Sequence, residues 1–415
     1  MNFQPRHGLS TIVNHAEEGN NPEHAHIMPI YMTSTFSFPD VATGAAIVAG
    51  EKPGYVYSRM DNPNIHQLAK KYAILEGLDL IRENPTKTPE EIVSARIFSS
   101  GMAAISTALL SCVQAGDTII SQRSLYGNTF SFMHELAPRL GINVVWVDGG
   151  EADQWEKAFE AHPGAKLAYA ETPANPTMEI VDLAHLVDVA NTFGAWVMVD
   201  NTFATPYCQR PLSLGVDVVV HSTTKYLTGH GLILGGAVVS RHPEFVNPEG
   251  QELFLMTKIL GGIPSPFDAW LANTGLKTFE LRMEKHNANA AVVAEYLNQH
   301  PKIERLMYPG IESHPGYETA RRQMPGGFGG MMSFELRGGF DAGVRMMNRV
   351  KMITLAVSLG LVDSLIQHPA SMTHAAYPRE DRLAAGITDG LVRFSVGIEN
   401  VQDILDDLDQ ALEGV

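Results

Sequence analysis

Short apolar runs alternate with amphipathic stretches through the middle of the chain, from about residue 66 to residue 245. The stretches 103–113 and 183–193 carry apolar side chains at helical spacing, which predicts helices there. The runs between helices are apolar on both faces, as in a sheet that is covered on both sides. This alternation predicts a mainly parallel α/β layer. The predicted strands are 95–99, 117–121, 143–147, 166–170, 195–199, 217–221 and 236–240.

The segment before this layer, residues 1–65, has no clear periodicity and is rich in turn-forming residues. These residues cluster at 18–22, 52–54 and 61–64. So long an irregular loop is unusual inside a compact domain. We therefore expect residues 1–65 to form an arm that packs on something else, such as a second subunit.

The pattern changes again after about residue 270. Helical patterns at 279–299 and 342–350 flank a predicted strand at 331–336, and 401–412 has one apolar helical face. The acidic side chains on the opposite face of 401–412 are interpreted as a solvated surface. The sequence thus predicts an arm at 1–65, an α/β domain at 66–270 and a smaller α+β domain at 271–415.

Composition narrows the class of protein. Of 415 residues, 45% are hydrophobic and 18% are charged, which is typical of a globular chain. The net charge of −16 should repel a phosphate backbone, so we expect no nucleic-acid partner. Two cysteines provide neither a disulfide framework nor a cysteine zinc site. The sequence lacks an apolar leader and a run long enough to span a membrane, so we expect a soluble, cytoplasmic protein without a membrane partner.

The common nucleotide and metal motifs are missing from the sequence. It contains no GxGxxG and no GxxxxGK[ST], which removes the main support for NAD or nucleoside triphosphate binding. It contains no HExxH either, and the pair His24 and His26 is the only metal-like spacing. Histidines two residues apart in an irregular arm are more typical of solvent-exposed side chains, so we expect no metal.

Polar residues follow two of the predicted strands, at the edge of a parallel sheet where ligands bind. One strand ends at Asp200, and the next continues into His221-Ser-Thr-Thr-Lys225. A desolvated lysine is nucleophilic enough for Schiff-base chemistry. The hydroxyls suit a phosphate, and Asp200 could keep a pyridine nitrogen protonated. Together these groups describe a pyridoxal 5′-phosphate (PLP) site; the alternative is a surface lysine and a helix-capping aspartate.

Two further strand-end features have alternative interpretations. Ser99–Ala103 lies between a strand and a helix, where glycine and free N–H groups suit an anion. The same segment could be a plain strand-to-helix turn. Tyr126 follows the strand at 117–121 and could stack on a planar cofactor or belong to the core.

Short motifs are spread along the chain at Tyr55–Arg59, Ser99–Met102, Glu171–Pro176, Val199–Phe203, His221–Tyr226 and Ser371–His374. Together they resemble the Cys/Met-metabolism family of PLP-dependent enzymes. The family includes cystathionine γ-synthase, cystathionine γ-lyase, O-acylhomoserine sulfhydrylases and methionine γ-lyase. The resemblance runs from about residue 25 to the C-terminus. It implies the aspartate-aminotransferase-like fold type I and a homotetramer built from two tight dimers.

The resemblance also implies roles for residues at the cofactor. Lys225 would carry PLP, Asp200 would pair with its pyridine nitrogen, and Tyr126 would stack on the ring and act as an acid or base near the substrate γ-position. The remaining implied contacts are Gly101, Met102, Ser222 and Thr224 at the phosphate, Tyr57 and Arg59 reaching that phosphate from the neighbouring subunit, and Asn175 and Thr202 beside the cofactor.

The same resemblance assigns the substrate site. Arg393 would clamp the α-carboxylate of an amino acid with its planar fork, and Ser358 would assist there. Without the resemblance, Arg393 and Arg59 would each be interpreted as ordinary surface charges. The implied chemistry is transfer of the α-proton by Lys225, loss of a β-proton, and departure of the γ-substituent with a proton from Tyr126. Hydrolysis then makes a γ-lyase, and capture by a thiol or sulfide makes a synthase.

The motifs that distinguish subfamilies are mixed. Phe36–Pro39, 44–51 and Leu365–His374 look most like methionine γ-lyase, whereas Asn128 stands where those lyases usually carry a cysteine. The leading hypothesis is therefore a PLP-dependent carbon–sulfur lyase that acts on methionine or a related sulfur amino acid.

Other segments look nearer to different members of the family. Pro264–Asp268 and Leu281–His286 resemble the cystathionine enzymes, and Gly229–Gly236 resembles the sulfhydrylases, with Leu232 in place of a polar or acidic residue. The alternatives are γ-replacement on an O-acylhomoserine, cystathionine γ-lyase activity, or a cofactor-binding protein without turnover. Residues 80–97 are longer than the family pattern and are interpreted as a surface loop rather than a partner site.

Overall fold

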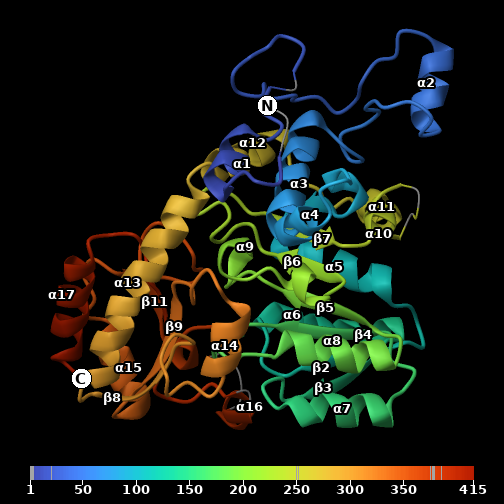
Figure 1. Cartoon of the computed structure of the whole chain (residues 1–415). Helices are drawn as coiled ribbons and strands as arrows, with labels where there is room; N and C mark the ends of the chain where they lie inside the picture. Colours follow the sequence, from blue (N-terminus) through green and yellow to red (C-terminus); the bar gives the residue numbers. More distant parts are fainter. Residues whose placement is uncertain are drawn as a thin grey trace.

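A computed structural model describes residues 4–19, 21–248, 250, 252–373, 375, 379–384 and 386–415. His374, the last residue of one family motif, lies outside these residues. Figure 1 shows two sheet-containing parts lying side by side, with an N-terminal arm that projects from the larger part. Among the described residues, the structure contains no helix with both the length and the apolar character needed to cross a bilayer.

The larger part is built on a seven-stranded sheet with the strand order β1-β7-β6-β5-β4-β2-β3. Neighbouring strands from β3 to β6 pair in parallel, and β7 is antiparallel to both of its neighbours. The prediction of a mainly parallel central sheet is confirmed. The strands are β1 Ser94–Phe98, β2 Thr118–Gln122, β3 Asn143–Val147, β4 Leu167–Glu171, β5 Trp196–Asp200, β6 Val218–His221 and β7 Gly236–Ser240.

Both faces of this sheet are covered by helices. Val197 and Val199 of β5 belong to one buried apolar cluster, and Met198 between them belongs to another. Successive strand residues point to opposite faces, so the continuous apolar runs in the sequence follow from burial on both sides. The helices of this part are α3 Pro63–Glu76, α4 Leu78–Glu83, α5 Gly101–Cys112, α6 Gly127–Ser131, α7 Ala152–Ala161, α8 Leu183–Thr192, α9 Thr205–Cys208, α10 Pro243–Val246, α11 Glu252–Leu260 and α12 Pro266–Leu276.

The smaller part has a five-stranded sheet with the order β10-β11-β12-β9-β8 and its own apolar core. Helix α13 joins the two parts, because Phe279 and Met283 pack in the core of the larger part while Val293 and Leu297 pack in the smaller one. The division at residue 270 stays a prediction. The elements are α13 Phe279–Gln299, β8 Ile303–Met307, α14 Tyr317–Gln323, β9 Met331–Leu336, α15 Gly339–Met347, β10 Thr354–Leu355, β11 Leu365–Gln367, α16 Arg379–Ala384, β12 Leu391–Ser395 and α17 Val401–Leu412.

The arm contains two helices that the sequence pattern did not predict, α1 Leu9–His15 and α2 Val41–Val48. Helix α1 buries Ile12 and Val13 in the core of the larger part. Helix α2 lies apart from the rest of the chain in Figure 1, although Asp40 caps its N-terminus by accepting a hydrogen bond from the Thr43 amide. Helix α2 packs on none of the described apolar cores of its own chain, so its sequence needs no apolar face at helical spacing toward them.

The longer segment at 80–97 begins inside α4 and ends in β1. Between them, Thr88 and Glu91 form a reciprocal capping box around a short 3-10 helix. Its interpretation as a surface loop stays a prediction. Short helices that are not α-helical occur at Pro89–Glu91, Phe132–Leu136, Pro138–Leu140, Pro211–Leu214 and Pro369–Ser371.

Candidate active site

The carboxyl ends of β4, β5 and β6 bring acidic residues together. Glu171 ends β4 and is paired in register with Asp200, which ends β5. Both side chains are buried, and burial raises the pKa of both carboxyl groups. The Thr202 amide donates to Asp200 Oδ1 over 2.9 Å, and the Tyr126 and Asn175 amides donate to Glu171 over 2.9 and 2.7 Å. Two buried carboxyl groups at one edge of the sheet are costly to ionise without a partner, so this edge favours a positively charged group beside them.

Lys225 lies in the loop that follows β6 and is largely withdrawn from solvent. Burial, together with the nearby Arg393 guanidinium, lowers the pKa of its amine to about 8. Its Nζ donates to Ser358 Oγ over 2.8 Å. A lysine with this pKa has a substantial neutral fraction near neutral pH, which nucleophilic attack on an aldehyde requires.

Arg393 is a buried side chain, 6% exposed, that β12 of the smaller sheet brings to Lys225. Its Nη1 donates to Asn175 Oδ1 over 3.1 Å, and its Nη2 donates to the Ser358 carbonyl over 2.6 Å. Ser358 has a φ of +89°, an uncommon backbone conformation for a serine. Burial lowers the pKa of Arg393 to about 10, so the guanidinium stays charged at neutral pH. Because its side chain is buried, Arg393 is not an ordinary surface charge.

The N-terminus of α5 faces the loop after β6. Ser100 caps the helix by accepting from the Ala103 amide over 3.1 Å. A Cβ at Gly101 would lie 2.7 Å from Ser222 Cβ, so only glycine permits this approach. The Ser222 amide donates to Thr202 Oγ1 over 2.9 Å. This arrangement brings helix N–H groups close to hydroxyls, a combination that can hold an anion.

Two residues assigned to the phosphate have contacts within the chain. Thr224 Oγ1 accepts from the Gly235 amide over 2.9 Å, so this hydroxyl also ties the Lys225 loop to the segment before β7. Met102 lies in the first turn of α5, with its sulfur 3.8 Å from Thr129 Oγ1. Their roles at the phosphate stay predictions.

Tyr126 stands at the start of α6 and is 41% exposed, so its side chain does not belong to the core. The Asn128 amide donates to Tyr126 Oη over 2.9 Å. The Tyr126 backbone amide is held by Glu171, as described above. The phenol is therefore accessible to a ligand at the edge of the sheet while its backbone is anchored to a buried carboxylate.

Tyr57 and Arg59 lie on the arm. The guanidinium of Arg59 lies 5.8 Å from the centre of the Tyr57 ring, and Arg59 donates to the Lys258 carbonyl in α11. Within the part of the chain that the structure describes, neither residue forms a hydrogen bond or ion pair with Ser222 or Lys225. The contacts of these two residues within their own chain therefore give no support for a role at its Lys225.

The residues at this edge fit PLP. Asp200 forms no ion pair with any described lysine, arginine or histidine, and such a buried carboxylate suits a protonated pyridine nitrogen. Lys225 suits the aldehyde, and the N-terminus of α5 with the nearby hydroxyls of Ser222 and Thr202 suits the phosphate. No group of three or more histidine, cysteine, aspartate and glutamate side chains among the described residues is placed to hold a metal ion.

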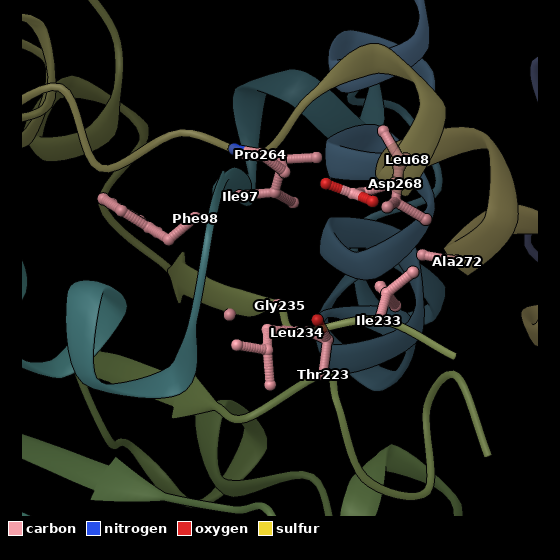
Figure 2. Close-up of a pocket in the computed structure, with 12 residues that line it drawn as sticks. Leu68, Ile97, Phe98, Thr223, Ile233, Leu234, Gly235, Pro264, Asp268 and Ala272 are labelled. Atoms are coloured by element: carbon pink, nitrogen blue, oxygen red, sulfur yellow. The ribbon is translucent and has the colours of Figure 1, made fainter. Parts of the chain in front are cut away.

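A small pocket elsewhere in the larger part is a poor match for a cofactor. Figure 2 shows it between Leu68 of α3, Ile97 of β1, Ala272 of α12 and Thr223. Its volume of about 10 Å³ is that of a single water molecule. The pocket is therefore a packing defect beside the Lys225 loop.

Glu171 and Gln122 were missed as functional residues by sequence reasoning. Gln122 ends β2, and its side chain exchanges two hydrogen bonds of 3.0 Å with the backbone of Glu171. Glu171 lies inside a family motif, but no role was given to it. Both are polar residues at the last position of a buried strand, which is the signal that could have identified them.

Comparison with known proteins assigns the chain to one family of PLP-dependent enzymes. The family described as Cys/Met metabolism PLP-dependent enzymes matches residues 10–413. The chain is 47% identical to an L-methionine γ-lyase of Fusobacterium nucleatum subsp. polymorphum, over 99% of both chains. It is 39% identical to an O-succinylhomoserine sulfhydrylase of Pseudomonas aeruginosa, over 97% of this chain and 95% of the other. A crystal structure of cystathionine γ-synthase from Xanthomonas oryzae pv. oryzae in complex with cystathionine matches with a TM-score of 0.88 and 38% identity, over 98% of both chains.

Proposed function

Because this chain belongs to the Cys/Met metabolism family of PLP-dependent enzymes, we propose that it catalyses γ-elimination on L-methionine. One methionine and one water molecule give 2-oxobutanoate, ammonia and a thiol. The observation that carries this choice is 47% identity with an L-methionine γ-lyase over nearly the whole of both chains. The proposal includes the site residues as placed above, with PLP as the cofactor and a small amino acid as the substrate.

The chain's own residues provide binding and proton transfer. Arg393 holds the substrate α-carboxylate with its charged fork and presents the α-carbon to Lys225. The Lys225 amine, kept partly neutral by burial, takes the α-proton. Tyr126 donates a proton to the departing sulfur. When bound, PLP supplies an electron sink for the negative charge that develops on the substrate carbons.

The substrate preference is tested by supplying purified, PLP-loaded protein with L-methionine as the sole substrate. We expect 2-oxobutanoate and ammonia to be released in equal amounts. A matched reaction contains O-succinylhomoserine with sulfide. Turnover of this pair without turnover of methionine would contradict the proposal.

Gamma-replacement is the second candidate function, and one contact favours it. Asn128 provides an amide beside Tyr126 Oη, where the resembling lyases carry a cysteine. The similarity to the O-succinylhomoserine sulfhydrylase is consistent with this alternative. In that case the Cγ–O bond of an acylated homoserine breaks, the acyloxy group leaves as a carboxylate, and a sulfide or thiol bonds to Cγ in its place.

The assembly proposed is a homotetramer of two tight dimers in the cytoplasm. The arm, residues 1–65, contacts the neighbouring subunit, while 66–270 bind PLP and 271–415 form the smaller domain. In support of this assembly, Met32, Val41 and Val48 on the arm are 67%, 89% and 68% exposed. Apolar side chains gathered on a projecting segment are typical of a subunit contact.

Arg59→Ala is expected to weaken PLP retention about tenfold or more, because it removes a charged contact with the phosphate of the neighbouring subunit. Retention is measured as the equilibrium dissociation constant of PLP. The control is Arg321→Ala, since Arg321 forms an exposed ion pair with Glu318 in the smaller part. Equal retention by the two variants would exclude the cross-subunit contact.

A further inference from the structure

A buried carboxylate–imidazole pair lies beneath the site at the ends of β5 and β6. Glu76 ends α3, and its Oε1 is 2.5 Å from His221 Nε2. Asn201 Nδ2 donates to the same oxygen over 2.8 Å. All three side chains are 1% exposed or less. The pair therefore lies outside the reach of substrate and solvent.

Hydrogen bonds of Asn201 extend the network to the end of a third strand, β4. Asn201 Nδ2 also donates to the Gln209 carbonyl over 3.0 Å, and Gln209 Nε2 returns a bond of 3.0 Å to Asn201 Oδ1. Gln209 Nε2 donates to the Thr172 carbonyl over 3.3 Å. The network thus connects Thr172, Asn201 and His221, the residues next to Glu171, Asp200 and Ser222.

The pair is not explained by stability alone. Burying a charged or strongly polar pair costs desolvation energy, and apolar side chains of similar volume are often neutral or stabilising there. The network also leaves buried atoms without a hydrogen-bond partner, namely Glu76 Oε2, His221 Nδ1 and Gln209 Oε1. Groups that are costly to bury and only partly satisfied point to a role in placing their neighbours.

We propose that Glu76 and His221 form a positioning pair that holds Asp200 against the cofactor's ring nitrogen. The proposal rests on the proposed role of Asp200. Asn201 transmits the constraint, because its side chain is held between Glu76 and Gln209 and its backbone amide donates to the Val220 carbonyl over 3.0 Å. Asp200, the preceding residue, then has little freedom to move.

Electrostatic interactions also favour the pairing of Asp200 with the cofactor's ring nitrogen. Burial raises the pKa of Asp200, and hydrogen bonds from Thr202 and the nearby His221 oppose that rise. His221 therefore acts in the same direction as Thr202, toward the ionised carboxylate that a protonated ring nitrogen requires.

The test compares Glu76→Gln with Asp217→Asn. Asp217 belongs to a second carboxylate–imidazole pair in the same sheet, since its Oδ1 is 2.8 Å from His242 Nε2 and its Oδ2 accepts from the Val197 amide over 2.8 Å. It precedes β6, at the opposite edge from the site. The measured quantities are the PLP dissociation constant, the absorption spectrum of bound PLP and the melting temperature. None of them requires turnover, so failure of the methionine assay does not affect this test.

Glu76→Gln is expected to raise the PLP dissociation constant about tenfold and to change the ratio of the absorption bands of bound PLP. Asp217→Asn is expected to lower the melting temperature while leaving both PLP measurements as in the wild type. His221→Gln, which keeps an amide donor for Glu76, should change both PLP measurements in the same direction. The proposal is overturned if Glu76→Gln behaves like Asp217→Asn, or if neither Glu76→Gln nor His221→Gln folds.

Discussion

Lys225→Ala is expected to lower kcat for 2-oxobutanoate release from L-methionine by about 10³-fold or more. Two functions are lost together, because the same amine holds PLP and carries the α-proton. The amine is positioned by Ser358 Oγ at 2.8 Å, and burial lowers its pKa to about 8. Among the described residues, no other lysine forms a hydrogen bond with Ser358 or Arg393. The reaction is followed by keto acid and ammonia release from PLP-saturated protein.

The control for Lys225→Ala is Lys166→Ala. Lys166 is an exposed residue at the amino end of β4, the opposite edge of the same sheet. Its removal should leave kcat within about twofold of the wild type, since isolated surface substitutions have small effects. If Lys225→Ala still retained PLP covalently after borohydride reduction and denaturation, the whole site assignment would be wrong.

Arg393→Ala is expected to lower kcat/KM for L-methionine by about 10²-fold, mainly through a higher KM. The guanidinium provides two parallel donors to a carboxylate, and a point charge cannot reproduce them. Arg393→Lys should therefore recover only part of the loss. The buried Asn175 Oδ1 and Ser358 carbonyl lose their partner in Arg393→Ala, so the melting temperature is measured alongside.

A substrate without the carboxylate separates binding from general damage. L-methioninol has an alcohol in place of the α-carboxylate, and its binding is measured from the change in PLP absorption. Wild type and Arg393→Ala should bind it equally, whereas L-methionine should bind the variant about 10²-fold more weakly. A loss of the same size for both ligands would show that Arg393 does not contact the carboxylate.

The positions of Asp200 and Lys225 followed from local sequence. Each stands just after a run of apolar residues, and the parallel sheet places the ends of such runs at one edge. The position of Gly101 was predicted in the same way, because a strand, a glycine and the start of a helix follow one another there. Sequence reasoning succeeded here because burial on both faces makes these strands visible as continuous apolar runs.

Arg393 and Glu76 could not be placed by local reasoning. Arg393 lies on an ordinary strand of the second sheet, next to the Ser358 loop of the same part, and only the packing of the two parts brings it to Asn175. Glu76 ends an amphipathic helix and would be interpreted as a solvated charge, yet it is 1% exposed and meets His221. In both cases the partner is distant in sequence, so no spacing or periodicity indicates the contact.

The sequence by itself determined the α/β class, the strand ends that carry Asp200 and Lys225, and the family with its PLP cofactor. Tertiary structure decided the electrostatic environment: which carboxylates are buried together, why the Lys225 amine has a pKa of about 8, and which charges are hidden from solvent. The physical reason is that side-chain alternation and helix periodicity are local properties of the chain. Desolvation and charge pairing depend on neighbours that only the packed fold brings together.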